Sequence, residues 1–213
     1  MGGTGQRRRN LAVIGSGLIG SAAARHLAKA GHAVVLVGPG EPADYAQHEG
    51  VFGSHYDEGR IARTLDLQPF WRRANAASVA RYAEIEAESG VAFYREVGVL
   101  HLGVAGDAAL EAFAAAASDV AGGSDEVHLE RYEGAALVRR FPFLRAASRS
   151  AGWFERHNAG HISPRQLVRA QRLAAQRAGA RFVDEAALRI TESGSGVRVD
   201  TASGAVEVDQ VLV

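Results

Sequence analysis

The sequence predicts an α/β protein that opens with a β-strand, an α-helix and a second, parallel strand. Three observations lead to this prediction. Residues 11–14 (LAVI) and 33–37 (AVVLV) are short, continuously apolar runs, which is typical of buried parallel strands. Between them, residues 18–30 place apolar side chains near one helical face. Gly31 then follows as a C-terminal stop signal for that helix.

The rest of the chain mixes helical and strand-like segments. Helices are predicted over residues 69–90, 107–120, 133–140 and 163–178, the last with Ser163 as N-cap and Pro164 in its first turn. Strands are predicted within residues 93–103, 127–131, 151–154, 181–183, 186–192, 197–201 and 206–213. Residues 43–66 fit neither pattern, and irregular segments of that length in compact domains are commonly functional.

Composition narrows the functional classes. The 213 residues are 47% hydrophobic and 23% charged, so a packed core is expected, and the formal net charge of zero gives no support for nucleic acid or an anionic membrane as partner. There is no cysteine and the eight histidines lack metal-ligand spacing, so no metal is expected. No apolar run approaches the length of a membrane span, and we expect a cytoplasmic protein.

The segment between the first predicted strand and helix, GSGLIG, has the form G-x-G-x-x-G. Its first glycine permits a tight turn, its second lets a diphosphate approach the backbone, and its third lets the helix pack closely on the strand. The helix N-terminus adds unpaired N–H groups and the positive end of the helix dipole. The sequence therefore predicts a dinucleotide site at Gly15, Ser16, Gly17, Leu18, Ile19 and Gly20.

One position departs from this fingerprint. A carboxylate normally ends the second strand and binds the ribose hydroxyls, but here Gly38 stands at that place. Glu41 follows three residues later and could reach round the turn, although an exposed turn glutamate is the simpler interpretation. No arginine stands at the strand end to indicate a ribose 2′-phosphate. Gly38 and Glu41 are both predicted to border the cofactor.

Several later segments carry a family resemblance. Residues 53–63 (GSHYDEGRIAR), 98–103 (GVLHLG), 141–142 (FP), 160–163 (GHIS) and 179–182 (GARF) follow the glycine motif in that order. Together they resemble the D-amino-acid-oxidase-like flavoproteins, and within them the branch of monomeric sarcosine oxidase and N-methyltryptophan oxidase. The resemblance covers residues 11–213.

The resemblance implies a glutathione-reductase-like Rossmann domain that binds FAD, with part of a mixed α+β substrate domain. Residues 10–85 and 163–213 would form a discontinuous, incomplete FAD domain, and residues 86–162 part of the substrate domain. Because the chain ends inside a strand-like pattern, we expect that the C-terminal half of the same enzyme is missing and would be its partner.

The resemblance also implies roles for particular residues. Arg60 would be a cation facing the flavin, and Arg63 would bind a substrate carboxylate, for which a guanidinium has matching geometry. On a helical turn these two would share a face, while two exposed arginines without a role is an equal alternative. His55 and Tyr56 stand where the family places a histidine pair near the flavin, and they complete the catalytic candidates. Ser54 and Leu188 complete the predicted cofactor contacts.

The predicted function is FAD-dependent oxidation of the C–N bond of an amine or (N-methyl) amino acid, by hydride transfer to the flavin and with O₂ as acceptor. An NAD(P)-dependent dehydrogenase domain is one alternative, although the β-rich stretch from Phe93 onward is unlike the regular βαβ units of such a domain. A truncated, non-catalytic nucleotide-binding fragment is the other alternative.

Overall fold

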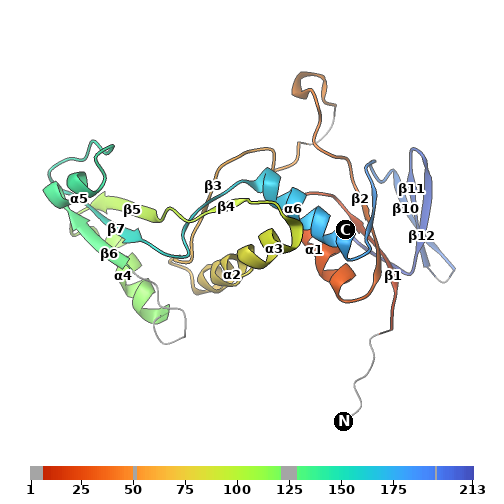
Figure 1. The fold of residues 1–213 in the computed structure, drawn as a ribbon, viewed down its shortest axis with the longest axis horizontal. Helices are drawn as coiled ribbons and strands as arrows, with labels where there is room; N and C mark the ends of the chain where they lie inside the picture. The colour runs from red at the N-terminus through yellow and green to blue at the C-terminus, as the bar shows by residue number, and fades with distance from the viewer. Residues whose placement is uncertain (1–6, 50–51, 121–128, 195) are drawn as a thin grey trace, which may run out of the picture. The chain divides into compact units, whose positions relative to one another are not determined.

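The structure, a computed structural model, describes residues 7–49, 52–120, 129–194 and 196–213. The chain forms two compact units (Figure 1). The first unit contains the chain up to Glu58, Ile85–Phe93 and Ser163–Val213. The second unit contains Gly59–Glu84 and Tyr94–Ile162. No described helix is both long and apolar enough to cross a membrane.

A parallel sheet forms the centre of the first unit. Its strands stand in the order β13-β1-β2-β9. Leu11 of β1 lies opposite Val34 of β2 and Gln210 of β13, and Leu36 of β2 lies opposite Phe182 of β9. The strands are β1 (Asn10–Ile14), β2 (Ala33–Val37), β9 (Arg181–Val183) and β13 (Gln210–Leu212).

Two helices cover one face of this sheet, α1 (Leu18–Lys29) and α6 (Pro164–Arg177), which run side by side in Figure 1. Alanines at their interface allow the helices to approach each other and the strands closely. Ser163 caps α6, because its Oγ accepts a hydrogen bond of 3.1 Å from the amide of Gln166. The core on this face consists of Val13, Ala24, Ala28, Val34, Leu36, Ala175 and Ala180.

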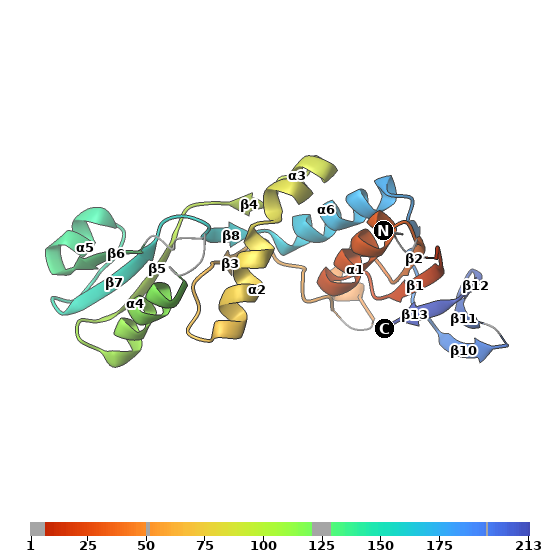
Figure 2. The ribbon, with the colours of Figure 1, turned by 90° about the horizontal axis from the view of Figure 1, so that it is seen from below.

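An antiparallel sheet covers the other face, shown in blue in Figure 2. It contains β10 (Arg189–Ser193), β11 (Gly196–Thr201) and β12 (Gly204–Val208). Ala12, Val35 and Val37 from the parallel sheet pack there with Val199 and Val208. Because β1 and β2 are covered on both faces, their side chains point into the core on either side of the sheet. An alternation of polar and apolar residues would bury polar groups, which explains why both sequences are continuously apolar.

The second unit contains two small antiparallel sheets. The first has the order β3-β8-β4, and the second has the order β5-β7-β6 (Figure 2). Leu137, Phe141 and Phe154 form a buried cluster beside the second sheet. The strands are β3 (Arg60–Ala62), β4 (Tyr94–Arg95), β5 (Val99–Val104), β6 (Leu129–Glu133), β7 (Ser150–Glu155) and β8 (Gly160–Ile162). The remaining helices are η1 (Tyr45–Gln47), α2 (Pro69–Val79), α3 (Tyr82–Ser89), α4 (Ala108–Val120) and α5 (Gly134–Arg140).

The α/β class is confirmed, while three predicted elements differ in detail. The helix predicted over residues 69–90 is two helices, α2 and α3. The predicted irregular segment 43–66 contains strand β3, which pairs with β8. The strand predicted over residues 206–213 is β12 and β13, because the chain changes sheets at Asp209, whose amide donates to the carbonyl of Asn10 at 2.8 Å.

The two units share the predicted limit between residues 162 and 163, and they divide the earlier part of the chain at other residues. Gly59–Glu84 belongs to the second unit because β3 finds its hydrogen-bond partner in β8. Ile85–Phe93 belongs to the first unit, where Glu88 forms an ion pair of 3.1 Å with the buried Arg25 of α1. The assignment of the units to cofactor and substrate remains a prediction.

Candidate functional site

The turn between β1 and α1 depends on a glycine in an unusual conformation. Gly15 has a φ of 99°, a region that side chains with a Cβ rarely adopt. Its amide donates a hydrogen bond of 2.7 Å to the carbonyl of Val37. The chain therefore turns sharply out of the sheet at Gly15, and the hydrogen bonding between β1 and β2 continues as far as this residue.

Two further glycines allow backbones to approach each other at this turn. A Cβ on Gly20 would overlap the carbonyl oxygen of Gly15, so helix α1 lies directly against the end of β1. A Cβ on Gly38 would lie 2.6 Å from the amide nitrogen of Ser16. With this backbone path, a residue that carries a Cβ does not fit at position 38 unless the turn shifts.

The N-terminus of α1 is not neutralised by the helix's own side chains. Gly17 is the N-cap residue and provides no side-chain cap, and the first turn contains no acidic residue. Leu18 is half-buried, and Ile19 is 86% exposed. The partial positive charge of the helix N-terminus is therefore available to an anion.

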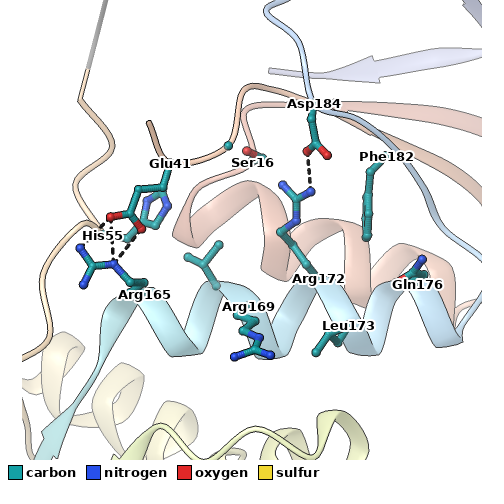
Figure 3. A pocket seen from close by; sticks show the side chains of 12 residues that line it. Ser16, Glu41, His55, Arg165, Arg169, Arg172, Leu173, Gln176, Phe182 and Asp184 are labelled. Atoms are coloured by element: carbon teal, nitrogen blue, oxygen red, sulfur yellow. Dashed lines mark hydrogen bonds and ion pairs between the residues drawn. The ribbon is translucent and has the colours of Figure 1, made fainter. Parts of the chain in front are cut away.

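A cavity of about 580 Å³ lies beside this turn (Figure 3). Its walls come from the turn, from the loop after β2, from one face of α6 and from the end of β9. The lining residues are Ser16, Gly40, Glu41, His55, Arg165, Val168, Arg169, Arg172, Leu173, Gln176, Phe182 and Asp184. All of them belong to the first unit.

Glu41 and Arg165 form a bidentate pair in the wall of the cavity (Figure 3). Nε of Arg165 lies 3.0 and 2.7 Å from the two carboxylate oxygens, and Nη2 lies 2.7 Å from Oε1. The same guanidinium donates to the hydroxyl of Tyr45 and the carbonyl of Tyr56, both at 2.9 Å, and also bonds Glu58. Glu41 is thus an ordered member of the cavity wall.

These hydrogen bonds change the ionisation of the pair. The hydrogen bond from Arg165 holds the pKa of Glu41 below its ordinary value of 4.5, and burial opposes this only partly. The hydrogen bonds that Arg165 donates to Glu41 and Glu58 raise the pKa of its guanidinium. Both charges therefore persist throughout the neutral range.

The depressed pKa of Glu41 predicts a particular pH dependence of stability. A carboxyl group whose pKa is lower in the folded than in the unfolded state stabilises the fold above the unfolded value and loses this contribution as pH falls through the folded value. We expect Glu41→Gln to lower the free energy of unfolding by a constant amount above the unfolded pKa of 4.5. The difference from the wild type should shrink below that pH.

Denaturant unfolding at several pH values between about 7 and 3 measures this difference. Arg165→Gln is the reciprocal variant and should reduce the effect of Glu41→Gln at neutral pH, because the partner is then already absent. A difference that grows as pH falls would contradict the assignment.

Helix α6 brings cations to the cavity that the sequence analysis did not identify. Arg165, Arg169 and Arg172 are spaced by four and three residues, so they share one helical face, and this spacing could have revealed them. Arg172 forms an ion pair with Asp184 and lies 4.6 Å from the ring centroid of Phe182. Arg169 is exposed and has no ion pair within the described part of the chain.

Two of the predicted catalytic residues lie near this cavity. His55 is buried, lines the cavity and would lie 3.5 Å from a Cβ on Gly17. Tyr56 is half-buried, stacks on Tyr45 with ring centroids 6.0 Å apart, and donates from its hydroxyl to the carbonyl of Gly40 at 3.3 Å. In the first unit both residues shape the loop after β2, and their catalytic role remains a prediction.

Arg60 and Arg63 lie in the second unit, and they do not share the common face that a helical turn would give them. Arg60 begins strand β3 and Arg63 follows its end, so the segment is extended. In an extended chain, residues three apart point to opposite faces, because the side-chain period is two. The strand forms because its backbone pairs with β8, an interaction distant in sequence.

Arg63 lines a second cavity, of about 360 Å³, within the second unit. Its Nε donates to the carbonyl of Leu65 at 2.9 Å, and its Nη2 lies 3.0 Å from Oδ2 of Asp66. The amide of Gln68 and the guanidinium of Arg63 lower the pKa of Asp66. The other lining residues are Ile61, Ala62, Trp71, Asn75, Ser78 and Tyr82.

Ser54 and Leu188 do not line either of these cavities. Ser54 lies in an exposed turn next to His55. Leu188 is 68% exposed and precedes β10, where its amide donates to the carbonyl of Asp200 at 2.8 Å. Their predicted contact with a cofactor has no support from the geometry of the described residues and remains a prediction.

The first unit has the features of a dinucleotide-binding α/β protein. They are a parallel sheet covered on both faces, a glycine turn into an open helix N-terminus, and an adjoining cavity with a carboxylate. Comparison with known families gives the finer class. The profile of the DAO family, described as FAD dependent oxidoreductase, matches residues 10–213. The chain belongs to this family.

Solved structures show the same fold. L-amino acid deaminase from Proteus vulgaris has a TM-score of 0.74 at 22% identity, covering 99% of this chain and 48% of that one. Glycine oxidase from Geobacillus kaustophilus has a TM-score of 0.72 at 20% identity, covering 97% and 55%. NikD, an amino acid oxidase essential for nikkomycin biosynthesis, has a TM-score of 0.72 at 21% identity, covering 97% and 51%.

The chain spans about half the length of each of these three proteins. No curated protein sequence matches it. The family prediction from the glycine motif and the later segments is confirmed, and so is the predicted glutathione-reductase-like fold.

Proposed function

We propose that this chain provides the FAD-binding part of an enzyme that oxidises the C–N bond of an amine or an amino acid, including N-methyl amino acids. The reaction would transfer a hydride to the flavin, with O₂ as the final acceptor. The observation that carries the proposal is the open glycine turn at α1 beside the cavity of Glu41 and Arg165.

The residues of the turn fit a nucleotide diphosphate. The absence of a Cβ on Gly17, the uncapped N-terminus of α1 and the lack of an acidic first turn leave room and positive potential for an anion. Glu41 would accept hydrogen bonds from the ribose hydroxyls, and Arg165 keeps this carboxylate charged and in place. The hydroxyl of Ser16 donates a hydrogen bond of 2.7 Å to the carbonyl of Pro39, which fixes the glycine turn against the loop after β2.

FAD, when bound, supplies the hydride acceptor, and the protein's own groups bind and orient the substrate. Arg63 would bind the substrate carboxylate, because Nη1 and one N–H of Nη2 remain after its bonds to Leu65 and Asp66. Asp66 places a negative charge beside it, and such a pair matches a zwitterionic amino acid. Burial raises the pKa of Tyr82, so its hydroxyl stays protonated at this cavity.

The related structures support an amino-acid substrate by analogy. Their names describe an L-amino acid deaminase, a glycine oxidase and an amino acid oxidase. Family membership favours FAD over the alternative of an NAD(P)-dependent dehydrogenase. The role of Arg60 as a cation facing the flavin, the need for further polypeptide from the same enzyme and a cytoplasmic location remain predictions.

Titration with FAD tests the cofactor assignment. We expect saturable quenching of flavin fluorescence, with competition by ADP and no competition by NAD⁺ at the same concentration. Hydrogen peroxide release with N-methylglycine then separates an active enzyme from a non-catalytic nucleotide-binding fragment. If FAD does not bind, or if NAD⁺ binds in its place, the proposal fails.

The variant Gly17→Ala tests whether the diphosphate of FAD lies against the backbone of Gly17. Its Cβ would make an ordinary contact of 3.5 Å with His55, so the fold should be retained, but the methyl group would occupy the approach to the backbone. We expect FAD affinity to fall at least about ten-fold. Gly59→Ala is the control, because its added Cβ also has no neighbour within 4 Å and Gly59 lines neither cavity. Equal affinities in the two variants would argue against a diphosphate at Gly17.

A further inference from the structure

A buried carboxylate lies beneath the turn that carries Arg63. Glu155 of β7 has a side-chain exposure of 0%. Its Oε1 accepts two backbone hydrogen bonds, from the amide of Thr64 at 2.8 Å and from the amide of Leu65 at 3.0 Å. Thr64 and Leu65 are themselves buried, so these amides require a protein acceptor.

The second carboxylate oxygen faces a buried histidine. Oε2 of Glu155 lies 3.7 Å from Nε2 of His101, whose side chain is 7% exposed. Neither atom has a hydrogen-bond partner among the described residues. The ring of Phe113 covers His101 with centroids 4.1 Å apart. Burying a carboxylate in such surroundings is costly, so a specific role for the group is expected.

The structure of the turn indicates that role. Arg63 immediately precedes the two residues whose amides bond Glu155. Its side chain bonds the residues that follow, the carbonyl of Leu65 and the carboxylate of Asp66. The carbonyl of Asp66 accepts a further hydrogen bond of 3.0 Å from the buried Arg72. The orientation of the Arg63 guanidinium in its cavity therefore depends on the backbone path of residues 64–66, which Glu155 fixes at its start.

We propose that Glu155 is a positioning residue, which fixes the 64–66 turn so that Arg63 presents its free N–H groups to a substrate carboxylate. This inference rests on the proposed function for the substrate class, and it extends that function to a residue outside the cavity. Glu155 does not touch the substrate. It acts through two backbone amides, and for this an acceptor oxygen at the right distance is sufficient.

Three substitutions of Glu155 test whether its role depends on the acceptor oxygen, on the negative charge or on the packing of its side chain. Glu155→Gln keeps an acceptor oxygen at the same reach, Glu155→Asp keeps the charge but shortens the side chain, and Glu155→Leu removes the acceptor. Glu130→Gln is the matched control, since this glutamate stands in the neighbouring strand β6 and bonds Arg156.

NMR of the whole chain gives two readouts that do not require FAD. Hydrogen exchange at the amides of Thr64 and Leu65 measures how firmly the turn is held. The indole N–H signal of Trp71, which lines the cavity of Arg63, should shift when N-methylglycine binds there. In Glu155→Leu we expect exchange at these two amides to accelerate at least about ten-fold, and N-methylglycine affinity to fall by a similar factor. Glu155→Gln and the control should stay within about three-fold of the wild type.

Each other outcome has a defined meaning. If N-methylglycine binds Glu155→Leu as tightly as the wild type, the inference is overturned, whether or not exchange accelerates. If Glu155→Leu does not fold, Glu155→Asp carries the test, with weaker binding expected there and not in Glu155→Gln. If the wild type itself shows no Trp71 shift, the role proposed for Arg63 fails, and this inference fails with it. FAD binding by the first unit is unaffected by that result.

Discussion

We expect Gly20→Ala to destabilise the first unit severely and to abolish FAD binding. The added Cβ would overlap the carbonyl oxygen of Gly15 and lie 2.9 Å from its carbonyl carbon. Both atoms belong to a backbone that is already constrained, because Gly15 adopts a positive φ and its amide is bonded to Val37. Neither the helix nor the turn can move without breaking the packing of α1 on β1.

The expected loss is about 3 kcal/mol or more, the upper end for overpacking of a core. Because domains are stable by only about 5–15 kcal/mol, such a loss should be visible as a large fall in the unfolding midpoint. Denaturant unfolding of the purified chain measures it. Gly40→Ala, where a Cβ has no neighbour within 4 Å, should change stability little. Similar midpoints for the two variants would show that the close approach of α1 to the turn is not required.

The second large effect is expected at Arg63, in the binding of carboxylate substrates. Arg63→Ala should raise the KM for N-methylglycine at least about 100-fold, equivalent to about 2.7 kcal/mol, because the substrate carboxylate would lose its charged partner. The change should fall mainly on KM, since the carboxylate is bound alike in the ground state and the transition state. Steady-state kinetics of the active enzyme measures both constants.

A substrate without a carboxylate gives the internal comparison, and its KM should respond much less. Arg73→Ala is the matched control, because Arg73 is an exposed arginine of α2 and does not line the cavity of Arg63. Arg63→Lys should recover only part of the affinity, since an ammonium lacks the planar fork of the guanidinium. An unchanged KM in Arg63→Ala would remove the assignment.

Local sequence patterns determined much of the first unit. The apolar runs 11–14 and 33–37, the glycines between them and Ser163 before Pro164 correspond to β1, β2, the turn and the capped helix α6. These features are readable because their physical causes are local. A strand covered on both faces needs apolar side chains throughout, and a tight turn at positive φ needs glycine. The family resemblance was readable for the same reason, since its segments are short and continuous.

The tertiary structure decided how distant residues meet. Arg165 reaches Glu41 only because α6 packs beside α1 and brings its N-terminus to the loop after β2. Strand β3 exists because β8 supplies its hydrogen-bond partner, and the extended backbone keeps Arg60 and Arg63 from sharing one face.

The sequence by itself therefore determined the chemistry of the glycine turn and the family of the protein. Only the fold determined which charged groups stand around the cavities. Glu155 illustrates the difference, because nothing in its neighbouring sequence indicates that it lies beneath the turn of Arg63. The physical reason is that hydrogen bonds and ion pairs between residues far apart in the chain depend on how strands and helices pack, and local periodicity carries no record of that packing.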